Sequence, residues 1–165
     1  MNKVELTSLT SIDDDFALWA AEQAALLGSG RFNRVDVENV AGELEYLGNS
    51  QKSEIESRLK VLLTHLLKWQ YQPAQRSNSW TATLIEQRTE IAEVIRRSPS
   101  LKHYPGQALE LRTYEIAMLR ASGETGLPKT AFPETCPYTI DQILDQTFLP
   151  GGSLTASVQS VCDVI

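Results

Sequence analysis

Residues 50–71 read SQKSEIESRLKVLLTHLLKWQY, and this stretch carries the strongest structural pattern in the chain. At about 100° per residue its large apolar side chains fall on one broad stripe, the pattern of an amphipathic helix. The stripe consists of Ile55, Leu59, Leu62, Leu63, Leu66, Leu67 and Trp69. A helix of about 22 residues is roughly 33 Å long, so we expect other helices to pack along it. We predict that Lys60, Thr64 and Lys68 face solvent.

The first predicted helix opens at about residue 13, runs to Leu27 and ends at a Gly-Ser-Gly sequence. Three aspartates at its start can cap it and suit the positive end of the helix dipole. Its predicted apolar stripe contains Phe16, Trp19, Ala20, Ala24, Leu26 and Leu27. Gln23 lies near the middle of this stripe, so its amide requires a hydrogen-bond partner.

A second predicted helix begins after Asp36 and ends at Gly48, before the long helix begins at Ser50. Its apolar residues follow the 3-4-3 spacing of a buried seam. The seam comprises Val37, Val40, Leu44 and Leu47. The acids that border the seam are Asp36 and Glu43, and those that face outward are Glu38 and Glu45.

Two further helices are predicted over residues 80–97 and 101–121, with proline-containing breaks before each and an irregular opening at Pro105-Gly106 in the second. Arg88 falls inside the apolar arc of the first of these helices. A buried guanidinium is costly unless it finds a carboxylate, carbonyls or a route to water. We predict that Arg88 is buried and bonded to a carboxylate, from Glu115, Glu43 or Asp36. The predicted buried polar network is Arg88, Glu115, Glu43 and Gln23.

After Gly123 the sequence predicts an extended, proline-rich strap that ends in one short helix capped by Thr139. The anchors of this strap on the bundle are expected to be Leu127, Phe132 and Tyr138. The fold class is therefore all-α, a single-domain bundle of about five helices with this C-terminal strap. We assign residues 13–150 to the bundle domain, residues 1–12 to a loose lead and residues 151–165 to a flexible tail.

The chain of 165 residues has the bulk properties of one globular domain. A net charge of −6 and a pI near 5.0 argue against general nucleic-acid binding. Two late cysteines, Cys136 and Cys162, without a signal peptide favour a cytoplasmic location, and no apolar run is long enough to cross a membrane. With only two histidines we exclude a histidine-rich metal centre, and we expect no cofactor.

Charge is unevenly distributed along the chain. Residues 13–56 contain ten acids and three bases, whereas residues 57–85 contain four bases and no acid. The second window also holds Trp69, Tyr71 and Trp80, so it offers a local basic and aromatic surface that can attract an anion. The alternative is that the two windows complement each other within the bundle.

The sequence resembles the domain of unknown function 29 family, which is common in cyanobacteria. The segments that carry the resemblance are DDDFALWAAEQAALLGSGRF, DVENVAGELEYLG, RLKVLLTHLLKWQYQP, SNSWTATLIEQRTEI, SPSL, ETGLP and FPETCPYTIDQILDQTFLP, within residues 13–150. The resemblance implies an all-helical fold and brings no established activity, substrate or catalytic residue. Where the second helix of the family usually has an acid, this chain has Gly42, which weakens any role for paired acids there.

The first functional hypothesis is a protein-interaction or self-associating module, with a homo-oligomer or a helical protein as the partner. The chain has no phosphate-binding loop, nucleophile elbow or CxxC motif, so we lean against an enzyme. Aromatic and arginine side chains are favoured at interface hot spots. The predicted interaction surface is Trp69, Tyr71, Arg76 and Trp80.

The second hypothesis is a metal-independent ribonuclease. Arg58 and His65 form an Arg-x6-His motif, which is similar to the Arg-x(4–6)-His signature of helical ribonucleases of the higher eukaryotes and prokaryotes nucleotide-binding type. In that chemistry the arginine stabilises phosphate charge and the histidine transfers a proton.

The third hypothesis is a carboxylate metal site in the bundle interior, because helical bundles can hold metals between facing helices. The candidate ligands are Glu43, Glu54, Glu115 and His65. The chain has no Glu-x-x-His pair, which such sites commonly use.

Overall fold

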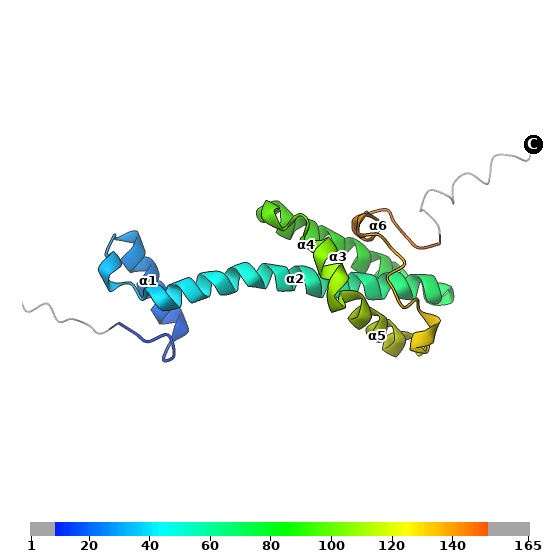
Figure 1. Ribbon diagram of the computed structural model, residues 1–165, viewed down its shortest axis with the longest axis horizontal. Helices are drawn as coiled ribbons and strands as arrows, with labels where there is room; N and C mark the ends of the chain where they lie inside the picture. The colour runs from blue at the N-terminus through cyan, green and yellow to red at the C-terminus, as the bar shows by residue number, and fades with distance from the viewer. Residues whose placement is uncertain (1–8, 152–165) are drawn as a thin grey trace, which may run out of the picture. The chain divides into compact units, whose positions relative to one another are not determined.

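The computed structural model describes residues 9–151, and every regular element among them is helical (Figure 1). The predicted all-α class is therefore confirmed. The described part of the chain falls into two compact units, which divide between Ser50 and Gln51. The predicted loose lead and flexible tail lie mainly outside the described residues.

The first unit begins with helix α1 (Phe16–Gly28). The Asp15 side chain caps it by accepting a hydrogen bond from the backbone N–H of Leu18. The helix ends where Gly30 takes φ 71°, a left-handed conformation that suits glycine. A short turn of 3₁₀ helix, η1 (Phe32–Arg34), then leads to Asp36, whose carboxylate accepts from the backbone N–H of Asn39 and caps the next helix.

Helix α2 (Val37–Tyr71) is one uninterrupted helix, so the predicted break at Gly48 is wrong. Glycine costs only about 1 kcal/mol relative to alanine inside a helix. Gly48 does not adopt a positive φ, so the chain continues through it in helical geometry. The first fourteen residues of α2 belong to the first unit and the remainder to the second.

The second unit is built around residues 51–71 of α2, with α3 (Asn78–Arg97) and α5 (Tyr114–Thr125) beside it (Figure 1). The predicted leucine stripe is its core. The stripe residues that are completely buried are Ile55, Leu59, Leu62, Leu63, Leu66 and Leu67, and Trp69 is half-buried. Burying six such side chains contributes on the order of 10 kcal/mol before opposing entropy.

Two residues that were predicted to face solvent from α2 are instead buried, Thr64 and Lys68. The hydroxyl of Thr64 donates to the Lys60 carbonyl of its own helix at 2.7 Å and lies 3.3 Å from the backbone carbonyl of Ala117 on α5. Helix α5 therefore covers a face of α2 that a one-sided amphipathic pattern assigns to water.

The segment predicted as one helix over residues 101–121 contains three helical pieces. They are α4 (Tyr104–Ala108), a π-helical segment η4 (Leu109–Thr113) and α5. The irregularity lies inside η4, where Leu111 has φ −80° and ψ −142°, rather than at the predicted Pro105. The short 3₁₀ turns of this unit are η2 (Pro73–Gln75), η3 (Pro99–Leu101) and η5 (Lys129–Ala131).

The strap closes the second unit as predicted. Phe132 and Tyr138 are buried in the core, and Leu127 packs against it. Thr139 caps the short helix α6 (Ile140–Leu144) through a capping box with Gln142. In the part of the chain that the structure describes, no helix combines the length and apolar character required to cross a bilayer.

Candidate functional site

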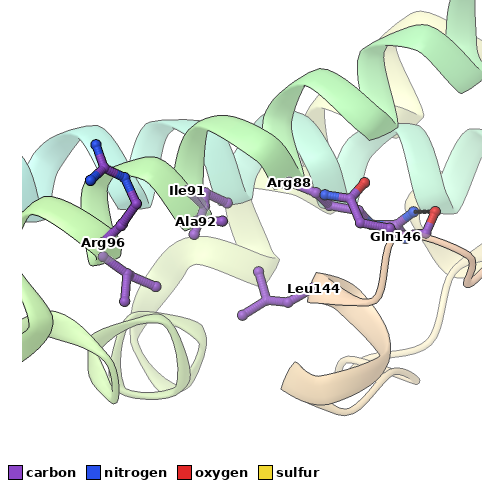
Figure 2. Close-up of a pocket in the computed structure, with 7 residues that line it drawn as sticks. Arg88, Ile91, Ala92, Arg96, Leu144 and Gln146 are labelled. Carbon is purple, nitrogen blue, oxygen red and sulfur yellow. Dashed lines mark hydrogen bonds between the residues drawn. The ribbon is translucent and has the colours of Figure 1, made fainter.

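A pocket of about 390 Å³ lies between α3 and the strap (Figure 2). Its walls are mainly apolar, and Arg88, one of its lining residues, has only 2% of its surface exposed. The lining residues are Arg88, Ile91, Ala92, Ile95, Arg96, Leu144 and Gln146. The predicted burial of Arg88 is confirmed.

The partners of Arg88 are backbone carbonyls of the strap. Its Nε donates to the carbonyl of Ile143 at 2.8 Å and its Nη2 to that of Phe148 at 2.9 Å. Its Nη1 lies 3.5 Å from the carbonyl of Gln146. The predicted carboxylate partner is therefore wrong. Burial lowers the pKa of the guanidinium and the Asp145 charge opposes this, so the group stays a cation that holds the strap.

The other members of the predicted polar network do not join Arg88. Glu115 is exposed and pairs with Arg112 at 3.2 Å, so its predicted burial is wrong. Glu43 is half-buried within the first unit. Gln23 is buried, and its Oε1 accepts from the backbone N–H of Asp36 at 2.8 Å, which supplies the partner predicted for its amide.

Arg58 of the ribonuclease hypothesis is paired with two glutamates. Its Nη2 lies 2.8 Å from Glu54 Oε1 and 3.3 Å from Glu90 Oε2. Two carboxylates at this distance more than balance one guanidinium, and a phosphate approaching it would meet net negative charge. The Glu54 pair follows from the i,i+4 spacing, whereas the Glu90 partner comes from α3.

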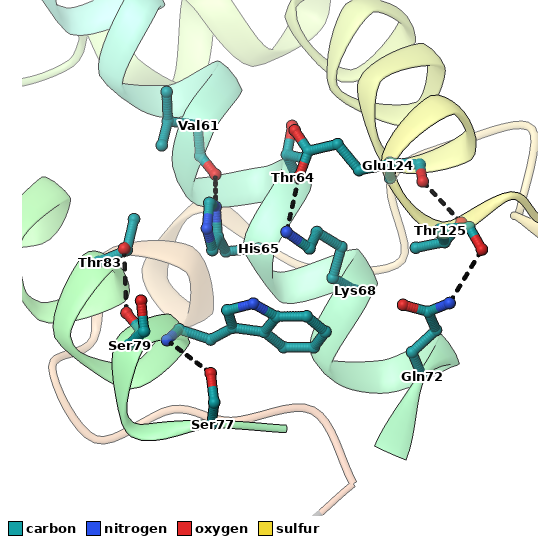
Figure 3. A network of polar contacts seen from close by, with 12 residues as sticks. Val61, Thr64, His65, Lys68, Gln72, Ser77, Ser79, Thr83, Glu124 and Thr125 are labelled. Carbon is teal, nitrogen blue, oxygen red and sulfur yellow. Dashed lines mark hydrogen bonds and ion pairs between the residues drawn. The ribbon is translucent and has the colours of Figure 1, made fainter. Parts of the chain in front are cut away.

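His65 is half-buried, and its Nδ1 donates to the backbone carbonyl of Val61 at 2.9 Å (Figure 3). Seven residues of helix separate it from Arg58, which corresponds to roughly 10 Å along the axis. The histidine is held by its own helix and the arginine by glutamates. The Arg58/His65 ribonuclease thus stays a prediction, in which Arg58 would have to bind phosphate while paired with Glu54 and Glu90.

Folding stability should decline as the pH falls below about 6.5, the ordinary pKa of histidine. Burial, the largest cause, lowers the pKa of His65, so between the folded and unfolded pKa values the unfolded chain binds more protons. The stability is complete above the unfolded pKa and is lost progressively below it. Urea unfolding of wild type and His65→Gln between pH 7.5 and 5.5 measures this, and the variant should show a flatter profile.

The second histidine provides the control for this experiment. His103 is exposed, so His103→Gln should keep the wild-type decline. A wild-type profile that is flat over this range, or a decline that persists in His65→Gln, would contradict the assignment.

The described residues contain no group of three or more His, Cys, Asp or Glu side chains placed to hold a metal ion. Of the predicted ligands, Glu54 is bound to Arg58 and Glu115 to Arg112. The structure thus directs these two carboxylates to arginines instead of bringing them together.

A polar cluster that sequence patterns missed lies around Lys68 (Figure 3). The Lys68 ammonium is 2.6 Å from Glu124 Oε2 and 4.6 Å from the centre of the Trp80 ring. Gln72 donates through Nε2 to the carbonyl of Thr125 at 2.9 Å. The cluster joins α2 to both α3 and the end of α5. The signal available in the sequence was that residues 57–85 lack any acid, so a buried lysine there needs one from elsewhere.

The predicted interaction surface is partly used within the fold. The Arg76 guanidinium stacks 4.9 Å from the Trp69 ring centre, and its Nε donates to the Trp69 carbonyl. The Tyr71 ring packs on Phe132 with centroids 5.0 Å apart. Arg76 is exposed, and the rings of Trp69, Tyr71 and Trp80 are half-buried. Binding by this set stays a prediction.

Large exposed apolar side chains are concentrated in the first unit. Of the twelve in the described residues, nine lie between residues 9 and 47. Val37 is 67% exposed, Leu44 65% and Leu47 57%, so the predicted burial of this seam is wrong. We define the α2 stripe as Val37, Val40, Ala41, Leu44, Leu47 and Gly48, which lie on one side of the first turns of α2.

Helix α1 also has more apolar side chains than the first unit buries. Its only charged residue is Glu22, so it is apolar over most of its circumference, yet only three of its residues are buried. They are Trp19, Gln23 and Leu26. Its predicted stripe is therefore only partly buried, since Phe16 and Leu27 are exposed. Helices that are apolar on all sides are normally covered.

Comparison with known proteins gives one match. A family model described as "Domain of unknown function DUF29" matches residues 12–149, which include parts of both compact units. Searches of curated proteins and of solved structures gave no match. Because the family model covers most of the chain and agrees with the resemblance seen in the sequence, the chain belongs to the DUF29 family.

Proposed function

We propose that the protein is an interaction module that binds another helix through the α2 stripe. The observation that carries this proposal is the exposure of Val37, Leu44 and Leu47 at heptad spacing on a regular helix. Apolar residues at positions a and d of a heptad are what helix pairing requires. Self-association and a helical protein partner are two forms of this function.

The amount of exposed apolar surface supports the proposal. Scattered single apolar residues on a surface need no explanation, whereas large groups of them mark binding sites. The nine exposed side chains of the first unit are each between 37% and 68% exposed. Three of them, Val37, Leu44 and Leu47, lie together on one side of α2.

The second unit provides an internal comparison. The same helix α2 carries six stripe residues after Ser50 that are completely buried. Its continuation before Ser50 carries an apolar stripe of similar pattern that other described residues leave exposed. This difference within one helix supports a role in binding for the stripe of the first unit.

We test the proposal with the double variant Val37→Gln/Leu44→Gln in the full chain. Light scattering would measure self-association, and affinity purification from the native host would measure partner capture. Association of the variant, with itself or with the captured partner, should be at least tenfold weaker than that of wild type. Because both side chains are exposed and glutamine is a good helix former, the melting temperature should change by only a few degrees.

The matched control is Ile85→Gln/Leu111→Gln, which removes two exposed apolar side chains from the second unit. This control should retain whatever association wild type shows. Equal association of the stripe variant and wild type would overturn the proposal. Equal loss in both double variants would show a general effect of exposed apolar area and would overturn it as well.

A further inference from the structure

The net negative charge of the chain belongs entirely to the first unit. Residues 1–50 carry nine acids and three bases, whereas residues 51–165 carry twelve of each. The acids of the first unit also lack partners of opposite charge within the part of the chain that is described, since every ion pair there involves residues between 54 and 124. The stripe therefore lies on an acidic body.

The acids are placed on both sides of the α2 stripe. With Val37 and Leu44 at heptad position a, Glu43 occupies position g. Asp36, one heptad earlier, is the cap residue of α2, and its carboxylate already accepts hydrogen bonds from Asn39 and Trp19. On the other side of the stripe, Ala41 and Gly48 occupy position e. Glu38 and Glu45 occupy position b, which is next to position e around the helix. The residues of this border are Asp36, Glu38, Glu43 and Glu45, of which Glu38 and Glu45 are exposed and the other two half-buried.

A second copy of the chain fits this border poorly. In an antiparallel pair, position g faces position g of the other helix, so Glu43 would meet an acid of the second copy. In a parallel pair, position g faces position e, where this chain has Ala41 and Gly48 and nothing to bond a carboxylate. Charges at these positions set the choice of partner and orientation.

We propose that the occupant of the α2 stripe is an amphipathic helix of another protein whose apolar face is bordered by lysine and arginine. This inference rests on the proposed function and specifies its partner. The stripe extends over twelve residues, so a partner helix of roughly 18 Å, about three turns, covers it. Complementary charge at the border selects the partner and speeds its association.

The side chains at the edge of the stripe favour close approach of such a helix. At Gly48 an added Cβ would meet no atom within 4 Å, and Ala41 one heptad earlier is exposed. The long aliphatic stems of lysine and arginine can lie across these small residues while their charged ends reach Glu38 or Glu45.

Two synthetic 21-residue helical peptides test the inference, both with leucine at positions a and d. One has lysine at e and g, and the other has glutamate there, so repulsion keeps each peptide from pairing with itself. Fluorescence anisotropy with the full chain should show binding of the basic peptide on the order of tenfold or more tighter than the acidic one. The difference should shrink as salt is raised.

Two variants show whether binding uses the α2 stripe and its border. Val37→Gln/Leu44→Gln should abolish binding of the basic peptide. Glu43→Lys should weaken binding of the basic peptide and strengthen binding of the acidic one. Glu110 is an exposed acid of the second unit, so Glu110→Lys should leave the binding of both peptides unchanged. These outcomes together establish the basic partner.

Other outcomes overturn it. Equal binding of both peptides would remove the role of charge. A dimer in light scattering that Val37→Gln/Leu44→Gln dissociates would identify a second copy as the occupant. Failure of both peptides, while capture from the native host still depends on the stripe, would reject the basic helix and leave the proposed function standing. If, in addition, capture from the native host did not depend on the stripe, both the basic partner and the proposed function would be rejected.

Discussion

Replacing Arg88 with alanine should lower the free energy of unfolding by about 3 kcal/mol, because the hydrogen bonds of a buried, charged guanidinium to the carbonyls of the strap are lost. The guanidinium is 2% exposed and holds the strap at Ile143, Gln146 and Phe148. The substitution leaves these carbonyls without donors and opens a cavity beside Ile91. For a chain of this size the melting temperature should fall by roughly 6–12 °C.

Thermal unfolding followed by circular dichroism measures this effect. Arg96→Ala is the matched control, because Arg96 is exposed on the same helix and pairs with Glu93 at the surface. Arg96→Ala should lower the free energy of unfolding by about 0.5 kcal/mol or less. Arg88→Lys should recover only part of the stability, since an ammonium cannot reproduce the planar fork. An Arg88→Ala protein that melts within two degrees of wild type would show that the carbonyl contacts contribute little.

The burial of Arg88 was predictable from the sequence, whereas its partners were not. Helical periodicity placed the side chain among Leu84, Ile91 and Val94, all of which are buried. The bonded carbonyls belong to backbone groups more than fifty residues away, and every residue type carries such a carbonyl. A sequence pattern identifies charged side chains that could serve as partners and gives no signal for a backbone acceptor.

Periodicity failed differently in the first unit. The spacing of Val37, Leu44 and Leu47 correctly predicts an apolar face on a helix. Such spacing states which side chains share a face and contains no information about what covers that face. The same reasoning succeeded for residues 55–67 because α3, α5 and the strap pack there. The exposed stripe, and thus the candidate binding surface, appears only once the packing is known.

The second large effect is expected for Tyr138→Ala, which should lower the free energy of unfolding by about 3–5 kcal/mol. The Tyr138 ring is buried and packs edge-on against Phe148 with centroids 5.8 Å apart. Its hydroxyl donates to Gln70 Oε1 at 2.5 Å and lies 3.4 Å from the Leu66 carbonyl. The side chain therefore fastens the strap to α2, as Arg88 fastens it to α3.

Tyr138→Phe separates the two contributions of this residue. It keeps the ring and removes the hydroxyl, so it should cost about 1 kcal/mol. Urea unfolding of both variants measures the difference. If Tyr138→Phe were as unstable as Tyr138→Ala, the hydrogen bond to Gln70 would be the main contribution and the ring packing a minor one.

The double variant Arg88→Ala/Tyr138→Ala shows whether the strap is held as one unit. Only a short segment containing α6 separates Tyr138 from the carbonyls that bind Arg88, so releasing either attachment should loosen the other. The double variant should therefore lower the free energy of unfolding by about 1 kcal/mol less than the sum of the decreases caused by the two single variants. Tyr138→Ala combined with Arg96→Ala should be additive, because Arg96 pairs only at the surface. Additivity in the first pair would mean that α3 and α2 hold the strap independently.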